Sequence, residues 1–280
     1  MSDEFRIMGV VNVTPDSFSD GGRFLDAQAA IAHGLELAGQ GAAILDIGGE
    51  STRPGAEPVA AEEELRRVLP VIEGLAAETA AQLSIDTSKA SVAAAAVAAG
   101  ATLVNDVTAL RADREMAGLV ASTGCDCCLM HMLGEPRTMQ QDPRYDDVVD
   151  DVKAFLEQRM AFAVREGVRE EQILLDPGIG FGKTVEHNLE LLQRLGEIAA
   201  IGRPVVIGTS RKTFLGKITG RDGTGDRIAA TIATNVLAYE RGARVFRVHD
   251  VAPVHDALLM TAATVSARWS PTTTPTSSTK

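Results

Sequence analysis

Three polar side chains that could bind a flat heterocycle lie at or just after the ends of short apolar runs of the chain. They are Asp86, Asn105 and Asp176. Carboxylates accept hydrogen bonds and an amide both donates and accepts, so together they suit a ring bearing N–H and amino donors, such as a guanine-like or pterin ring. Pro177 keeps Asp176 extended and ends its run, and the glycines that follow let backbone approach a ligand closely.

A second group of side chains carries positive charge. Arg247 and His249 are two residues apart, as are Ser210 and Lys212. Within an extended strand each pair therefore shares a face. Two cations, a titratable imidazole and a hydroxyl favour an anion site. Taken singly, Arg247 could equally be a solvated surface charge and His249 a hydrogen-bonded structural histidine, but their pairing favours the anion site.

A glycine-rich segment and a cysteine cluster suggest two chemistries that the sequence supports only weakly. Residues 177–184 read PGIGFGKT, but a phosphate-binding P-loop needs glycine where Pro177 stands, and a dinucleotide fingerprint would need a third glycine. Cys127, Cys128 and His131 could form part of a metal site, yet no second cluster of cysteines or histidines completes four ligands. We expect these thiols to be core residues.

Eight short apolar runs are the elements that must position these side chains. They are too short and too continuously apolar for one-sided antiparallel strands, and they fit parallel strands buried on both faces. The runs are residues 7–13, 42–47, 83–85, 103–107, 125–132, 173–175, 204–207 and 245–248. Amphipathic stretches follow most of them, which predicts an α/β fold, a single-domain (β/α)8 TIM barrel. An open doubly wound sheet is the alternative.

In such a barrel the active site lies at the carboxyl ends of the strands. Every predicted strand has polar residues at that end: Asn12, Asp46, Asp86, Asn105, His131, Asp176, Lys212 and Arg247. Loops begin at strand ends, so one or two polar residues there would mean little. Polar residues at all eight ends predict a converging site.

Acidic residues mark two helix starts. Asp26 is the expected N-cap of a helix that reaches Gly39. Glu62, Glu63 and Glu64 are expected in the first turn of the next helix, where the helix dipole favours acids. The amphipathic stretches 93–99, 147–165, 188–199, 226–238 and 254–267 continue the alternation.

Composition narrows the class of partner. The chain has 280 residues and a formal net charge of −11, which argues against nucleic acid and anionic membranes. No apolar run approaches the ~20 residues of a membrane span, and the acidic N-terminus lacks the features of a signal peptide. Three cysteines within four residues cannot form a disulfide framework, which favours the cytoplasm.

We expect residues 1–268 to form the barrel and residues 269–280 to be a disordered tail.

The chain resembles the dihydropteroate synthases, the folate-pathway enzymes that sulfonamides inhibit. The resemblance runs from about Phe5 to Ala267. The motifs are MGVVNVTPDSFSDGG (8–22), ILDIGGESTRPGA (44–56), SIDTSK (84–89), NDV (105–107), LMHM (129–132), LLDPGIGFGKT (174–184), GTSRK (208–212) and RVHD (247–250). The resemblance implies a (β/α)8 barrel that condenses 6-hydroxymethyl-7,8-dihydropterin pyrophosphate with 4-aminobenzoate and releases pyrophosphate.

The resemblance also implies roles for individual residues. The pterin would be bound by Asp86, Asn105, Asp176 and Lys212. The pyrophosphate would be held by Asn12, Arg247 and His249, with Mg²⁺ near Asn12. The aminobenzoate site would be shaped by Thr52, Arg53, Pro54, Phe181, Ser210 and Lys212. Phe18 and Asp20 lie on a first loop that would close with the second over the substrates.

Those roles suit the expected chemistry. Carbon–oxygen cleavage leaves a pterin-stabilised cation, which Asp86 and Asp20 could stabilise. Arg247, a protonated His249 and Mg²⁺ could stabilise the departing pyrophosphate. The arylamine attacks at neutral pH without prior deprotonation, so no strong general base is required. The family also implies a homodimer.

Two related functions stay open. The pterin-binding barrel of corrinoid-dependent methyltransferases shares the Asp–Asn–Asp set but needs no pyrophosphate site. A non-catalytic paralogue would bind pterin and turn nothing over. Lys212, Arg247 and His249 favour the synthase over the methyltransferase, and the intact loop sequences around residues 16–22 and 52–55 argue against the paralogue.

Overall fold

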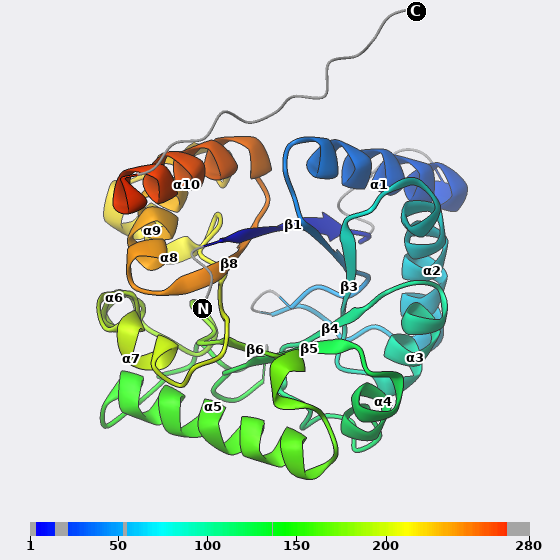
Figure 1. Cartoon of the computed structure of the whole chain (residues 1–280), viewed down its shortest axis with the longest axis horizontal. Helices are drawn as coiled ribbons and strands as arrows, with labels where there is room; N and C mark the ends of the chain where they lie inside the picture. The colour runs from blue at the N-terminus through cyan, green and yellow to red at the C-terminus, as the bar shows by residue number, and fades with distance from the viewer. Residues whose placement is uncertain (1–3, 15–21, 53–54, 136, 268–280) are drawn as a thin grey trace, which may run out of the picture.

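The computed structural model describes residues 4–14, 22–52, 55–135 and 137–267. Eight parallel strands close into a barrel in sequence order, and helices surround it as an outer ring (Figure 1). The strands are β1 (Arg6–Asn12), β2 (Ile44–Gly48), β3 (Gln82–Asp86), β4 (Leu103–Asp106), β5 (Asp126–Met130), β6 (Ile173–Asp176), β7 (Val205–Ile207) and β8 (Ala243–Val248). The predicted (β/α)8 TIM barrel is confirmed, and the open-sheet alternative is wrong.

The helices confirm the predicted alternation, with differences at their ends. They are α1 (Gly22–Gly39), α2 (Ala61–Glu78), α3 (Ala90–Ala98), α4 (Met116–Thr123), α5 (Val148–Arg165), α6 (Val185–Gln193), α7 (Leu195–Ala199), α8 (Thr213–Thr219), α9 (Ile228–Glu240) and α10 (Val251–Ser266). The first turn of α2 contains Glu62, Glu63 and Glu64, as predicted. The N-cap prediction for Asp26 is wrong, because residues 23–25 contain no helix breaker and α1 extends back to Gly22.

Layers of inward-facing side chains fill the barrel. The central layer is apolar and buried, and it consists of Met8, Ile44, Leu103, Cys128, Leu174, Val206 and Val245. Cys127, the neighbour of Cys128 on β5, belongs instead to the core between strands and helices. Burial raises the pKa of both thiols above the ordinary value. The prediction that these cysteines are core residues is therefore supported.

Among the described residues, no helix is long and apolar enough to cross a membrane. The predicted tail, residues 269–280, lies outside the described part of the chain.

Candidate active site

Strand alternation brings the predicted polar residues to one end of the barrel. Two residues beyond the apolar layer each strand points inward again. Asp46 follows Ile44 on β2 in this way, and Asn105, Asp176 and Arg247 occupy the same place on β4, β6 and β8. Asp86 is in register with Asn105 across β3 and β4. The carboxyl ends of the strands therefore meet in a polar, charged layer.

Arg247 and Asp46 form the centre of this layer. Arg247 Nε donates to Asp46 Oδ2 at 2.6 Å, and its Nη2 donates to Asp86 Oδ2 at 2.8 Å. Asp46 is completely buried and also accepts from Ser84 Oγ at 2.6 Å and from Asn105 Nδ2 at 3.0 Å. One aspartate thus links β2, β3, β4 and β8 and fixes the amide of Asn105.

Sequence reasoning gave no binding role to Asp46. The signal was its spacing, because an acid two residues after the inward-facing Ile44 must also face inward. A buried carboxylate needs a counter-charge and donors. Arg247, Ser84 and Asn105 supply them, so Asp46 holds two predicted site residues in place.

The two carboxyl groups predicted to bind pterin are buried and perturbed. Burial raises the pKa of Asp86 to about 7; Arg247 opposes the shift and Asp46 adds to it. Burial also raises the pKa of Asp176. The Gly178 N–H opposes this shift, because it donates to Asp176 Oδ1 at 2.7 Å and so stabilises the carboxylate. Buried, preoriented carboxyl groups suit recognition of a ring edge that carries hydrogen-bond donors.

Arg247 is a counterion as well as a candidate anion ligand. Burial disfavours its charged form, but Asp46 and Asp86 outweigh this and raise the pKa of Arg247 above its ordinary value. The guanidinium therefore stays charged, and an incoming anion would share it with two carboxylates. The reading of Arg247 as a solvated surface charge is wrong, because its partners Asp46 and Asp86 are both buried.

His249 lies beside Ser210 and close to two arginines. Its Nδ1 lies 3.0 Å from Ser210 Oγ, which also accepts from the His249 backbone N–H at 3.2 Å. Burial, followed by Arg247 and Arg211, lowers the pKa of His249 to about 3. The ring is therefore neutral in the ligand-free chain, whereas a protonated His249 beside bound pyrophosphate stays a prediction. A neutral imidazole can still donate one hydrogen bond to a phosphate.

Arg211 links the segments that follow β7 and β8. Its guanidinium contacts both carboxylate oxygens of Asp250 at 3.0 and 2.6 Å, a bidentate pair. Its backbone adopts a φ of 59°, and its N–H donates to Thr231 Oγ1 at 3.3 Å. Arg211 thereby fixes its neighbours Ser210 and Lys212. No sequence signal identified this pairing, since the partners are 39 residues apart.

The glycine loop, residues 177–183, brings Phe181 to Lys212. Gly178 has a φ of 67°, and a Cβ there would lie 1.9 Å from the carbonyl oxygen of His131, so the close approach requires glycine. Lys212 Nζ lies 4.0 Å from the centre of the Phe181 ring, a cation–π contact. Two residues predicted for the aminobenzoate site are therefore in contact.

The first and second loops are described only in part. Four predicted residues lie outside the described residues: Phe18, Asp20, Arg53 and Pro54. Thr52 is described and half-buried. At the base of its loop Glu50 Oε1 accepts from the Val59 N–H at 3.3 Å, and Glu50 Oε2 pairs with Lys89. This bond holds the two ends of the second loop together.

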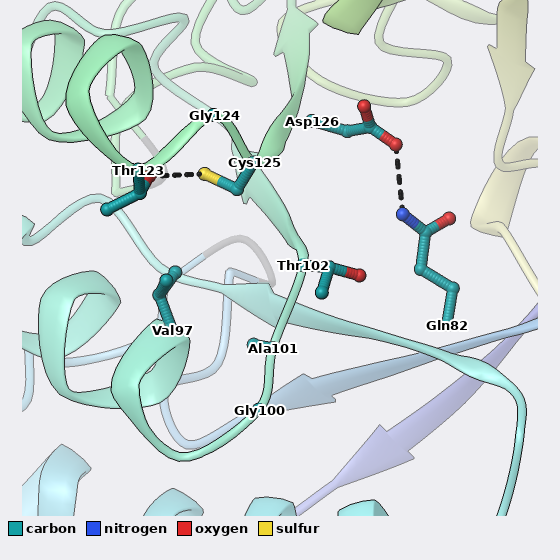
Figure 2. Close-up of a pocket in the computed structure, with 9 residues that line it drawn as sticks. All are labelled: Gln82, Val97, Gly100, Ala101, Thr102, Thr123, Gly124, Cys125 and Asp126. Carbon is teal, nitrogen blue, oxygen red and sulfur yellow. Dashed lines mark hydrogen bonds between the residues drawn. The ribbon is translucent and has the colours of Figure 1, made fainter.

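A hollow of about 320 Å³ lies at the opposite end of the barrel, where β3, β4 and β5 begin (Figure 2). Its polar side chains bond to one another: Gln82 Nε2 donates to Asp126 Oδ2 at 2.9 Å, and Thr123 Oγ1 lies 3.2 Å from Cys125 Sγ. In barrels of this fold the amino-terminal end serves stability, so we place the active site at the other end.

Comparison with known proteins agrees with this site. A family model for pterin-binding enzymes matches residues 8–249. Dihydropteroate synthase of Escherichia coli strain K12 is 42% identical over 263 residues, which cover 94% of this chain and 93% of that protein. The structure of Xanthomonas albilineans dihydropteroate synthase with 4-aminobenzoic acid matches with a TM-score of 0.89 and 50% identity over 94% of both chains. Its complex with 7,8-dihydropteroate matches with a TM-score of 0.86 and 48% identity over 94% of this chain and 95% of that one.

The fold, the buried carboxyl groups at its carboxyl end and these similarities define the class. The chain belongs to the family of pterin-binding enzymes. Within that family it groups with the dihydropteroate synthases, which are transferases of folate biosynthesis.

Proposed function

We propose that the chain condenses 6-hydroxymethyl-7,8-dihydropterin pyrophosphate with 4-aminobenzoate to give 7,8-dihydropteroate and pyrophosphate. The observation that supports this best is the buried set of Asp86, Asn105 and Asp176 beside the cations Arg247 and Lys212. The set offers acceptors for the N–H and amino groups of a pterin next to positive charge for an anion. The relatives solved with 4-aminobenzoic acid and with 7,8-dihydropteroate support both halves of the site.

Pterin binding would rest on groups that are already oriented. Asp176 is held by the Gly178 N–H, and Asn105 by its bond to Asp46. Because the donors and acceptors are buried, a ring that pairs with them recovers hydrogen bonds in a low-dielectric setting. A ligand without matching N–H groups would leave buried carboxyl groups unpaired and would be rejected.

The pyrophosphate would lie against Arg247, the neutral His249 and Asn12. Mg²⁺ takes oxygen ligands and usually keeps several waters together with substrate phosphates, so one protein oxygen beside the pyrophosphate suits it. The amide oxygen of Asn12, half-buried at the end of β1, would be that protein ligand. When bound, the ion would offset the charge of the leaving pyrophosphate.

The reaction exchanges one bond of the pterin methylene carbon for another. Its bond to the pyrophosphate oxygen breaks and the electron pair leaves with the pyrophosphate, while the amine nitrogen of aminobenzoate forms the new bond and then loses a proton. Asp86 and Asp20 would stabilise the positive charge that develops on the pterin, and Lys212 and Arg247 would stabilise the departing anion. One preorganised contact of this kind is worth about 3–4 kcal/mol in the transition state.

The aminobenzoate would bind where Phe181 and Lys212 meet, close to Ser210 and with Thr52, Arg53 and Pro54 contributed by the second loop. The apolar face of Phe181 would pack against the aromatic ring, and a cation would pair with the carboxylate. Sulfonamides present an arylamine of similar shape and would compete for this place.

A homodimer and a cytoplasmic location complete the proposal. Most of the large apolar side chains exposed among the described residues lie on α6, α8, α9 and α10: Leu189, Ile218, Leu237, Leu259, Met260 and Val265. Helix α9 packs against the other three, so these helices form one side of the barrel (Figure 1). Exposed apolar side chains on neighbouring helices suit a two-fold contact with a second copy. The proposed cytoplasmic location rests on the three closely spaced cysteines, which cannot form a disulfide framework.

A turnover assay tests the proposed function. The protein is mixed with both substrates and Mg²⁺, and released pyrophosphate is measured. We expect release only when both substrates are present. Pterin binding without any release would identify a non-catalytic pterin-binding paralogue, and failure to bind the pyrophosphate substrate with retained binding of a folate-type pterin would favour the methyltransferase barrel.

A further inference from the structure

Lys183 is a buried amine that the reaction described above does not use. Its side chain lies at the end of the glycine loop and is 3% exposed. Nζ lies 2.9 Å from His131 Nδ1 and donates to the carbonyl oxygen of Phe181 at 3.0 Å. A buried amine needs such partners, because an unpaired one is costly.

His131 is built to accept from Lys183. It is buried, and its ring meets Phe155 edge-on at a centroid distance of 4.9 Å. Burial, followed by Lys183 and Arg111, lowers the pKa of His131 to about 2, so the imidazole is neutral. A protonated lysine amine can only donate, so beside charged Lys183 the Nδ1 atom acts as the acceptor and the ring proton sits on Nε2.

The rest of the glycine loop is also held by side chains from outside it. Its polar backbone atoms bond to side chains of β6, of α6 and of the segment between β5 and α5. These bonds are Gly178 N–H to Asp176, Gly180 N–H to Asn188, Gln140 to the Gly180 carbonyl and Tyr145 to the Gly182 carbonyl, each 2.7 Å long. Lys183 supplies the corresponding bond to the carbonyl oxygen of Phe181.

The position of Phe181 determines the contact that Lys212 makes. Lys212 Nζ lies 4.0 Å from the Phe181 ring centre, and the methylene groups of Lys212 lie against Gly180. A change in the backbone at Phe181 would therefore move both groups expected to contact aminobenzoate. The contacts run from His131 through Lys183 and Phe181 to Lys212.

We propose that Lys183, held by His131, is a positioning residue for the aminobenzoate half of the site: its bond to the Phe181 carbonyl sets where Phe181 and Lys212 meet the second substrate. This inference rests on the proposed function. Burial lowers the pKa of Lys183 to about 7, with Asp176 opposing and Lys212 adding to the shift. The amine can donate to Phe181 in either charge state, so the positioning is expected to persist through neutral pH.

Lys183→Met separates positioning from a general structural role. Methionine retains the apolar stem and removes the donor. We expect kcat/KM for 4-aminobenzoate to fall about tenfold or more, the effect of losing one hydrogen bond to a charged group. The dissociation constant of a phosphate-free pterin, measured by calorimetry, should change less than about threefold, because its ligands keep their own donors. Lys217→Met, at an exposed lysine of α8, is the control and should change neither value.

A pair of variants at His131 keeps the test decisive if Lys183→Met folds poorly. His131→Gln retains an acceptor for Lys183 and should stay within about threefold of the wild type in kcat/KM for 4-aminobenzoate. His131→Leu removes the acceptor and should fall about tenfold. Equal effects of the two His131 variants, or equal loss of pterin and aminobenzoate use in Lys183→Met, would overturn the inference. An inactive wild type would refute the proposed function itself, and the inference with it.

Discussion

Replacing Arg247 with methionine is expected to destabilise the barrel strongly. The side chain of Arg247 is 24% exposed, whereas those of its partners Asp46 and Asp86 are 0% and 8% exposed. Removing one member of a buried ion pair costs about 3–5 kcal/mol, because the remaining charge loses its compensation. Asp86, with a pKa of about 7, can take up a proton instead. We therefore expect a loss of about 3 kcal/mol at pH 8, the lower end of that range, and a smaller loss at pH 6.

Urea unfolding followed by circular dichroism at both pH values measures this loss. Arg194→Met is the matched control: its side chain is 28% exposed, but its partners Asp147 and Glu197 are 38% and 46% exposed. The control should lose much less stability. Adding Asp46→Asn to Arg247→Met should restore part of the loss, since an amide needs no counterion. A loss under ~1 kcal/mol, typical of exposed pairs, or one equal to that of the control, would refute the counterion role.

Two other perturbations test the glycine loop and the histidine. Gly178→Ala should abolish pterin binding or folding, because the added Cβ would meet the His131 carbonyl. Gly220 has the same φ of 67° but no atom within 4 Å of such a Cβ, so the control Gly220→Ala should lose only about 1 kcal/mol of stability. Similar losses in the two variants would show that backbone conformation alone matters. The pKa of His249 is about 3 in the folded chain and 6.5 ordinarily. Between these pH values the unfolded chain binds more protons than the folded chain, so the free energy of unfolding falls as pH drops from 6.5 toward 3. His249→Gln should flatten that dependence by up to about 1.4 kcal/mol per pH unit, and an unchanged slope would contradict a neutral imidazole.

The sequence predicted the barrel because its strands are buried on both faces. A run such as residues 173–175, which reads Ile-Leu-Leu, has no polar alternation, so its apolar character indicates the strand directly. Polar residues at or next to the carboxyl ends of these runs then located Asp86, Asn105, Asp176 and Arg247. The start of α1 was harder, because Asp26 resembles a cap although the residues before it also favour a helix.

The contacts between strands could not be predicted. Arg247 was assigned to an anion because nothing in a linear sequence places it 2.6 Å from Asp46, 201 residues away. The lowered pKa of His249 could not be predicted for the same reason, since it depends on burial beside Arg247 and Arg211. Lys183 carried no predicted role, because its bonds to His131 and Phe181 arise only in the folded loop.

Calorimetry of pterin binding to Asp176→Asn tests the central claim most directly. The asparagine can still accept from the Gly178 N–H, so the glycine loop should keep its shape, while one charged acceptor for the ring is lost. A phosphate-free pterin should bind the wild type and lose about tenfold or more in affinity for the variant, as expected for a hydrogen bond to a charged group. Equal affinities would show that the buried carboxyl group at the end of β6 does not bind the pterin, and would contradict the account.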